Sequence, residues 1–477
     1  MSFDTNFDTN TANKQPGLIR GLGPWAAAAI VVGTMIGTGI FIKPANMAQE
    51  AGTVGLVTLA WVIGGVLSLF GALCAAELGA AIPEAGGTYA YMNRAFGPVW
   101  GYLFGWTYSI IGAPTSIATI ASGLLVFASF LFPVVATPLW ALHFSLPFFH
   151  APVHFTFTWA QPLAVVAIAL VTSINYFGVK LGGRVQVVLT VIKIAAVIAV
   201  IFIGFFLGKG SIANFHSVSA SMGQLGIAAA LLTATASGLW AYDGWINLTF
   251  VGSEIKNPGR NIPLALIVGV LVVCGIYTAM SAACFYVLPF ATVAASAHIA
   301  SDVIARATGA NAATWMTIVM MICALGTLNS SILTNARVDY AMARDGLFFR
   351  VVRGVHPRFR TPANALVFQG ILASALALTG TFESLSLLYV FLVWIFYGAQ
   401  TVGLIVLRRK EPNMPRPYRT WGYPAVPIIF ILGALALTVD VLVQKPLRSA
   451  IGIGVMLIGL PLYAHWRKRF APEPLAK

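Results

Sequence analysis

The sequence predicts an all-α integral membrane protein with twelve transmembrane helices, and three observations predict it. First, the 477 residues are 58% hydrophobic and only 9% charged, with a mean hydropathy of +0.85, whereas about a quarter of an average soluble domain is charged. Second, the charged residues are separated by uncharged stretches about as long as one membrane span. Third, two of the expected helices are interrupted by glycine at matching places in the two halves of the chain.

The uncharged stretches give the positions of the helices. No Asp, Glu, Lys or Arg occurs between Arg94 and Lys180, and a transmembrane helix needs roughly 20 apolar residues. The stretches are continuously apolar, which excludes a β-barrel, because the strands of a barrel alternate apolar and polar residues. The predicted helices cover 24–45, 54–81, 97–131, 160–179, 183–208, 225–250, 262–289, 312–343, 362–381, 384–407, 422–443 and 447–466.

The basic residues predict the orientation. The net charge is +14, and with both termini inside most Lys and Arg fall in inner segments, which follows the positive-inside rule. We therefore expect a multi-pass protein of the cell inner (plasma) membrane with both termini cytoplasmic, and we attribute the basic charge to topology rather than to nucleic acid binding. The basic residues expected outside are Lys43, Lys209, Arg306, Lys445 and Arg448.

The segment 132–158 is predicted to be an outer loop rich in Pro, Phe and His. Its histidines are His143, His150 and His154. Their spacing is loose and no carboxylate or Cys joins them, so we interpret them as exposed loop residues rather than metal ligands. The cysteines of the chain all fall inside apolar spans, where buried packing explains them better than a disulfide framework or a metal pair.

Two predicted helices are broken by glycine. Residues 33–41 read Gly-Thr-Met-Ile-Gly-Thr-Gly-Ile-Phe, and residues 237–245 read Ser-Gly-Leu-Trp-Ala-Tyr-Asp-Gly-Trp. In hydrocarbon, backbone N–H and C=O groups stay unpaired only where they line a cavity or bind something. Breaks at corresponding positions of two halves indicate the substrate site of a transporter, and a repeat of five spans inserts its second copy upside down.

The first break has two interpretations. Glycines there tolerate unusual backbone angles, and an unwound stretch would expose N–H groups at the start of the next half-helix, where the partial positive charge binds carboxylate. Thr38 adds a hydroxyl. The alternative is close helix packing, because Gly33 and Gly37 have the spacing of a small-xxx-small contact. The sequence leaves both open.

The second break contains Asp243, an acidic residue within a span, which faces a cavity or a partner by default. It would bind a cation, bind a substrate amine or relay a proton. Its alternative role is to cap the next half-helix, where Asp is a preferred N-cap, and we favour the cap because Asp243 directly precedes Gly244. Trp240 and Tyr242 are candidate gates over an apolar side chain, with ordinary aromatic packing as the alternative.

Lys193 lies deep within a predicted span, between Val-Ile and Ile-Ala-Ala. A buried ammonium must pair with a carboxylate or with carbonyls, or lose its proton. Carbonyls freed by the first break are natural partners, so Lys193 would do there what a sodium ion does elsewhere, and a structural tether is compatible with that role. Nearer the inner face, we expect Asp339 to form a charge network with Arg337 and Arg344.

Several function classes are disfavoured. The sequence contains no Walker A pattern, no HExxH and no dinucleotide fingerprint, and its spans hold only isolated polar groups rather than a constellation of His, Asp and Glu. We therefore expect no enzyme activity, no cofactor and no metal. A channel would build its pore from rings of residues across subunits, whereas two breaks within one chain fit alternating access better.

At these residues the chain resembles the amino acid–polyamine–organocation (APC) superfamily, and within it the bacterial relatives of the L-type amino acid transporters. The resemblance implies the LeuT-type five-plus-five inverted repeat, with helices 1 and 6 broken and helices 11 and 12 added. The stretches that carry it are 33–41, 71–92, 185–195, 238–263, 329–346 and 407–417.

The resemblance also implies roles for individual residues. Trp240 occupies the position of an aromatic outer gate, and Lys193 matches a family lysine near the place of sodium in sodium-coupled relatives. Asp243 departs from the animal L-type pattern, which has a small residue there, and this leaves the charge preference open. The residues implied to hold the substrate carboxylate through backbone N–H groups are Ile36, Gly37, Thr38 and Gly39. Those implied to receive the α-amine through carbonyls are Trp240, Ala241 and Tyr242.

The sequence thus predicts a sodium-independent secondary transporter that moves neutral L-amino acids by alternating access, as an exchanger or linked to protons. A cationic amino acid or polyamine permease is the alternative, and a channel is the remote one. We expect L-amino acids and the lipid bilayer as partners, and no disulfide-linked heavy chain, because 132–158 contains no Cys. The expected regions are a cytoplasmic tail at 1–23, a ten-helix transport core at 24–409, helices 11 and 12 at 410–467, and a cytoplasmic tail at 468–477.

Overall fold

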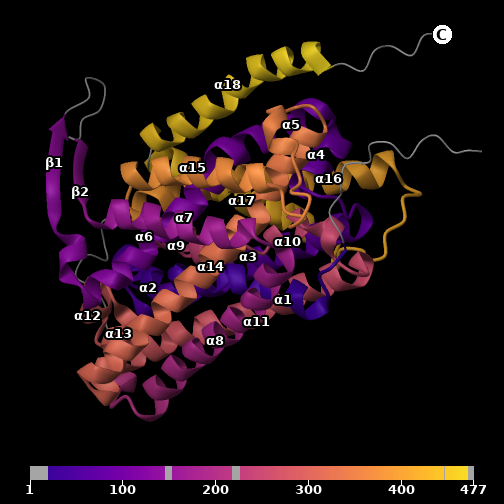
Figure 1. The fold of residues 1–477 in the computed structure, drawn as a ribbon. Helices are drawn as coiled ribbons and strands as arrows, with labels where there is room; N and C mark the ends of the chain where they lie inside the picture. Colours follow the sequence, from indigo (N-terminus) through magenta and orange to yellow (C-terminus); the bar gives the residue numbers. More distant parts are fainter. Residues whose placement is uncertain (1–19, 145–152, 217–225, 445, 471–477) are drawn as a thin grey trace, which may run out of the picture.

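The computed structural model describes residues 20–144, 153–216, 226–444 and 446–470, which form a bundle of helices with one β-hairpin at its edge (Figure 1). The first half contains α1 (Pro24–Met35), α2 (Thr38–Ala51), α3 (Val54–Ala81), α4 (Thr88–Phe96), α5 (Pro98–Thr107), the π-helix η1 (Tyr108–Gly112), α6 (Ala113–Leu131), η2 (Pro133–Ala136), β1 (Pro138–Phe144), β2 (Val153–Thr158), α7 (Ala160–Tyr176), α8 (Val179–Phe206) and η3 (Ile212–His216). The second half contains α9 (Ile227–Tyr242), α10 (Asn247–Phe250), η4 (Gly252–Glu254), α11 (Pro258–Val287), α12 (Phe290–Ala295), α13 (Ile299–Thr308), α14 (Ala310–Arg344), η5 (Arg350–Arg353), α15 (Ala363–Thr379), α16 (Phe382–Lys410), α17 (Ala425–Gln444) and α18 (Pro446–Phe470).

Apolar helices long enough to cross a membrane dominate the described residues. Nine candidate spans meet that length and hydropathy, and α7, α9 and α15 are shorter apolar helices. Every range predicted from the sequence contains a helix, and α3 begins and ends where it was predicted. The chain is therefore a mostly helical membrane protein, as expected from its composition.

Small residues allow the helices to approach one another. In hydrocarbon, helix association depends on packing rather than on expulsion of water, so small side chains are favoured at the contacts. A Cβ atom added to Gly65 of α3 would lie 2.7 Å from the sulfur of Cys274 on α11, and one added to Gly71 would lie 2.6 Å from the ring of Phe430 on α17. These glycines permit α3 to sit between α11 and α17.

Backbone hydrogen bonds join α10 and η4 to the residues just before α1 and just before α4. The N–H of Leu22 donates to the carbonyl of Glu254 at 2.9 Å, and the N–H of Gly86 donates to the carbonyl of Phe250 at 2.9 Å. The Glu254 side chain, almost fully buried, pairs with Arg337 of α14 at 2.9 Å. The segment that follows the second glycine break is thereby fixed to three other parts of the bundle.

The predicted charge network around Asp339 is wrong. Arg337 pairs with Glu254, and Arg344 pairs with its neighbour Asp345 at 3.3 Å. Asp339 is buried, and its carboxylate has no hydrogen-bond partner in the described part of the chain. The pairing follows from the position of η4 beside α14, which sequence spacing does not give.

An antiparallel hairpin, β1–β2, stands where an outer loop was predicted. Its residues are rich in aromatic, β-branched and Thr side chains, which favour strands. The register pairs His143 with His154, so two of the three predicted loop histidines lie opposite each other, while His150 lies outside the described residues. No group of three or more possible metal ligands occurs within the described ranges.

Candidate substrate site between two broken helices

The first break is short. Helix α1 ends at Met35, Ile36 is extended with φ −72° and ψ 94°, Gly37 has φ −140° and ψ −144°, and α2 begins at Thr38. Gly33 and Gly39 lie within the helices, so the break is narrower than the predicted 33–41 stretch. No side chain caps the start of α2, and the first N–H groups of a helix have no partner within it. These donors are therefore available to an anion.

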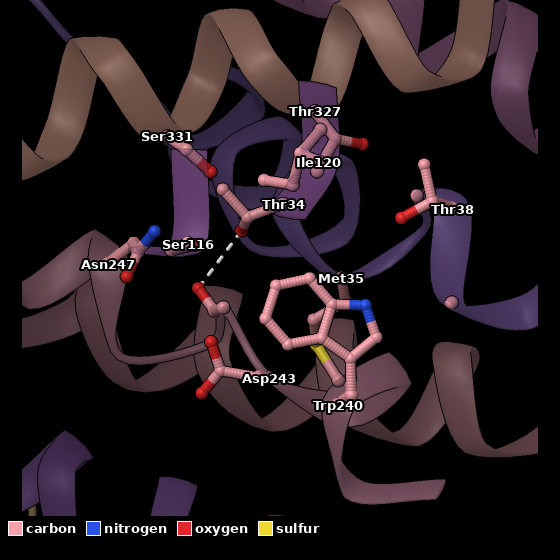
Figure 2. A pocket seen from close by; sticks show the side chains of 13 residues that line it. Thr34, Met35, Thr38, Ser116, Ile120, Trp240, Asp243, Asn247, Thr327 and Ser331 are labelled. Carbon is pink, nitrogen blue, oxygen red and sulfur yellow. Dashed lines mark hydrogen bonds between the residues drawn. The ribbon is translucent and has the colours of Figure 1, made fainter. Parts of the chain in front are cut away.

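The second break is held open by Gly244. Helix α9 ends at Tyr242, Asp243 is extended, and Gly244 has φ +108°, a conformation that favours glycine. A Cβ atom there would also lie 2.9 Å from the Cβ of Thr34. The Thr34 hydroxyl donates to the Gly244 carbonyl at 2.9 Å, and this hydrogen bond, dashed in Figure 2, joins the two breaks directly.

A small polar cavity lies between the two breaks (Figure 2). The volume of the cavity is about 20 Å³. A water molecule needs roughly 10–15 Å³ by that measure, so an amino acid requires the walls to move apart. The lining residues are Thr34, Met35, Gly37, Thr38, Gly39, Ser116, Ile120, Trp240, Asp243, Gly244, Asn247, Thr327 and Ser331.

Five of the predicted binding residues line this cavity and three do not. Those that line it are Gly37, Thr38, Gly39, Trp240 and Asp243. Ile36 is fully buried behind it, and its carbonyl accepts a hydrogen bond from Thr327 at 3.1 Å. Tyr242 points elsewhere: its hydroxyl donates to the Trp61 carbonyl at 2.9 Å. Of the two interpretations of Tyr242, its contacts therefore favour packing.

Gly39 satisfies both interpretations of the first break. It lines the cavity, yet a Cβ atom on it would lie 2.7 Å from the Cα of Ala241, so it also allows α2 to touch α9. Behind this contact, Tyr277 of α11 places its hydroxyl oxygen 2.5 Å from the Met35 carbonyl and 3.1 Å from the Ala241 carbonyl. A single hydroxyl thus binds the ends of α1 and α9 together.

Asp243 does not cap the following half-helix. Helix α10 begins at Asn247 and has no side-chain cap, so that preferred interpretation is wrong. The Asp243 carboxylate accepts hydrogen bonds from the hydroxyls of Tyr389 at 2.7 Å and Tyr397 at 2.8 Å, both on α16. Both carboxylate oxygens are occupied by neutral donors at the edge of the cavity.

Trp240 lies at one end of the cavity in an aromatic layer. Its ring packs edge-on against Tyr389 at 5.4 Å and against Phe382 at 6.0 Å between centroids. Beyond Phe382, the ammonium of Lys43 lies 5.4 Å from the ring centroid and 3.1 Å from the carboxylate of Glu383. The Lys43 side chain is only 1% exposed. These layers separate the cavity from the end of the bundle at which α16 begins.

Lys193 contacts the first break as predicted. Its ammonium donates to the Gly33 carbonyl at 2.6 Å and to the Thr327 hydroxyl at 2.6 Å. Since Thr327 in turn donates to the Ile36 carbonyl, Lys193 of α8 and Thr327 together bind carbonyls at the end of α1 that have lost their helical partners. The expected carbonyl partner is confirmed.

Five polar lining residues were not among the predicted binding residues: Thr34, Ser116, Asn247, Thr327 and Ser331. A signal was present for two of them, because Thr327 and Ser331 are four residues apart and so share one face of α14. Ser116 and Asn247 carry no pattern that distinguishes them from neighbouring polar residues such as Thr115 and Thr249, and only the packing of α6 and α10 against the breaks brings them here.

A helical membrane bundle in which two broken helices share a polar cavity defines a membrane transporter. A family model described as amino acid permease matches residues 22–460. The chain belongs to this amino acid permease family, whose members are transporters and not enzymes.

Individual relatives match along most of the chain. The b(0,+)-type amino acid transporter 1 of Mus musculus is 33% identical over 93% of this chain and 85% of its own length. The Serine/threonine exchanger SteT of Bacillus subtilis (strain 168) is 31% identical over 95% of this chain and 98% of its own length. The Large neutral amino acids transporter small subunit 2 of Homo sapiens is 31% identical over 94% of this chain and 81% of its own length.

Proposed function

We propose that this chain exchanges small neutral L-amino acids across the plasma membrane by alternating access, without sodium. The observation that carries the proposal is the pair of helix breaks that face one cavity while the Lys193 ammonium binds the Gly33 carbonyl. The arrangement proposed is twelve spans in a LeuT-type five-plus-five inverted repeat, with both termini cytoplasmic. Nine candidate spans and three shorter apolar helices in the described ranges support that count.

The substrate carboxylate is assigned to the start of α2. The N–H groups of Thr38 and Gly39 begin a helix without a side-chain cap, and the partial positive charge of a helix N-terminus attracts anions. The Thr38 hydroxyl lines the same cavity. The α-amine is assigned to the carbonyl end of α9 at Trp240–Tyr242, which carries partial negative charge. Of these residues Trp240 lines the cavity, whereas the Ala241 carbonyl would have to exchange its hydrogen bond from Tyr277 for one from the amine.

The size and the polarity of the cavity lining favour small, neutral substrates. The cavity is narrow, and its lining outside the breaks carries hydroxyl and amide groups from Ser116, Asn247 and Ser331. Each oxygen of the Asp243 carboxylate already accepts a hydrogen bond from a tyrosine hydroxyl, so a second substrate amine would have to share these oxygens with Tyr389 and Tyr397. The relative named as a serine/threonine exchanger supports a preference of this kind.

Sodium independence rests on Lys193. In sodium-coupled relatives of this fold, unwound carbonyls coordinate the ion. In this chain an ammonium donates to such a carbonyl at 2.6 Å, and a second cation at the same place would be repelled. The free cysteines Cys74, Cys284 and Cys323 are buried in helices and Cys274 is half-buried in α11, so we propose that no partner subunit is attached through a disulfide.

Uptake into proteoliposomes tests the proposal. Serine, threonine, leucine, arginine and glutamate are offered outside, with and without internal serine, in sodium or in choline buffer. We expect serine and threonine uptake that requires internal substrate and is unchanged in choline. Uptake that stops without sodium would contradict the role of Lys193, and uptake that proceeds without internal substrate would contradict exchange.

A cationic amino acid or polyamine is the second candidate, because Asp243 lines the cavity. The same assay decides between the two: arginine that is taken up better than serine would favour this candidate and would mean that the tyrosines release the carboxylate.

A further inference from the structure

The hairpin β1–β2 has one apolar face and one polar face. The register pairs Trp140 with Phe157 and Leu142 with Phe155, whereas the intervening pair is Ala141 with Thr156. Successive residues of a strand point to opposite faces, so the positions alternate between large apolar residues and small or polar ones. The rings of Trp140 and Phe157 stack at 5.1 Å with an angle of 10° between their planes.

The apolar face is exposed together with its surroundings. Leu142 is 51% exposed, and Trp140 is also exposed. Phe132 and Val134, where α6 ends, and Trp159, just before α7, are exposed as well. A group of large apolar side chains therefore lies uncovered at one end of α6 and α7.

This surface continues the lipid-facing side of α7. The exposed apolar residues of α7 repeat at intervals of three or four and so form a single stripe along the helix. A stripe of this kind on a membrane helix contacts lipid tails. The strand β2 ends at Thr158 and α7 begins at Ala160, so the hairpin adjoins the N-terminal end of this stripe. The stripe consists of Leu163, Val166, Leu170 and Ile174.

The direction and charge of the hairpin fit a membrane surface. In Figure 1 the two strands, at the left, run across the ends of the helices rather than along them. No Asp, Glu, Lys or Arg occurs between Arg94 and Lys180, so no such charged side chain keeps the apolar face of the hairpin from the hydrocarbon just below the headgroups. Trp is enriched at this depth, because its ring is amphipathic.

We propose that the hairpin is a membrane-surface anchor: its face with Trp140 and Leu142 lies in the headgroup region of the bilayer, and its face with Ala141 is in water. The positive-inside distribution predicts that this is the outer leaflet. The anchor binds neutral lipid rather than anionic headgroups, since the hairpin carries no Lys or Arg and its only basic side chains are histidines. The anchor would hold the N-terminal end of α7 at a constant depth in the bilayer.

Fluorescence quenching tests the anchor with a matched pair of variants. Leu142→Cys and the control Ala141→Cys are labelled with an environment-sensitive maleimide dye on the full chain in vesicles of neutral phospholipid. Labelling of the unmodified chain gives the background signal from the native cysteines. We expect lipids with a nitroxide near the headgroup to quench position 142 several-fold more strongly than position 141, and aqueous iodide to show the reverse order. Adding anionic lipid or salt should leave both results unchanged.

Three outcomes would overturn the proposal. Equal quenching of the two positions by the lipid nitroxide would mean that the hairpin stands in water. Efficient disulfide cross-linking between two copies of the Leu142→Cys variant, with no lipid quenching, would mean that a second copy of the chain covers this face. Quenching that appears only with anionic lipid would mean that charge and not the apolar face binds the surface. Serine exchange by the same preparations verifies that both variants are folded.

Discussion

Gly39→Ala perturbs the point at which α2 touches α9. The new Cβ atom would lie 2.7 Å from the Cα and 2.8 Å from the Cβ of Ala241, closer than unstrained carbon atoms approach, so the two half-helices must separate. Overpacking by one methyl group typically costs about 1–3 kcal/mol. Because 1.4 kcal/mol is a factor of ten, this corresponds to an increase of about 5- to 150-fold in the apparent KM if the closed site bears the whole strain.

The assay is serine exchange in proteoliposomes, together with the Tm of the purified protein. Gly275→Ala is the matched control, since it lies in α11 and a Cβ atom there meets nothing within 4 Å. Adding Ala241→Gly to Gly39→Ala should restore function only in part, because it removes the side-chain methyl group but leaves the backbone of residue 241 in the way. If Gly39→Ala matched Gly275→Ala in both KM and Tm, the close approach of α2 and α9 would have no part in closing the site.

Four further substitutions test other contacts. Lys193→Met removes two hydrogen bonds from a charged donor, each contributing about 1.5–3 kcal/mol, and should severely slow exchange; unaltered kinetics would exclude Lys193 from the mechanism. Arg337→Leu leaves Glu254 buried without its partner and should destabilise the fold by about 3–5 kcal/mol, measured as a lower Tm. Arg94→Leu breaks a partly exposed pair and should cost less than about 1 kcal/mol, so equal losses would contradict the importance of burial. Asp243→Asn should keep serine exchange and weaken any inhibition by arginine, measured by competition; inhibition that persists unchanged would show that Asp243 does not set charge preference.

The elements that hydropathy determines were predictable. Each span is a continuous apolar stretch, and the lipid solvent requires that its backbone form a helix, which is why α3 coincides with its predicted range. Lys193 was predictable for the same reason: within a span, an ammonium must find an oxygen, and the broken helix offers one.

Most other contacts between distant segments were not predictable. Asp243 resembled an N-cap because its neighbours in sequence suggested one, but its carboxylate binds Tyr389 and Tyr397, which lie 146 and 154 residues further along the chain. Arg337 was assigned to the wrong acid for the same reason. The predictions for Asp243 and Arg337 both relied on spacing in the sequence, whereas the packing of the helices determines which residue each side chain contacts.

The hairpin escaped prediction for a different reason. Its strands are short, and the aromatic and Pro residues that fill 132–158 are equally consistent with an irregular loop. Alternation of apolar and polar positions becomes evident only once the register is known. Short strands at the edge of a helical bundle give too weak a pattern to be distinguished from a loop.

The side chain of Lys193 belongs to the chain and, unlike a coupling ion, cannot cross the membrane with the substrate. In the proposed exchange of one neutral amino acid for another, no net charge then moves in either half of the cycle. The membrane potential supplies about 2.3 kcal/mol per elementary charge at 100 mV, and none of this would be available to the exchanger. Its direction would be set by amino acid gradients alone, equally in energised and in depolarised cells.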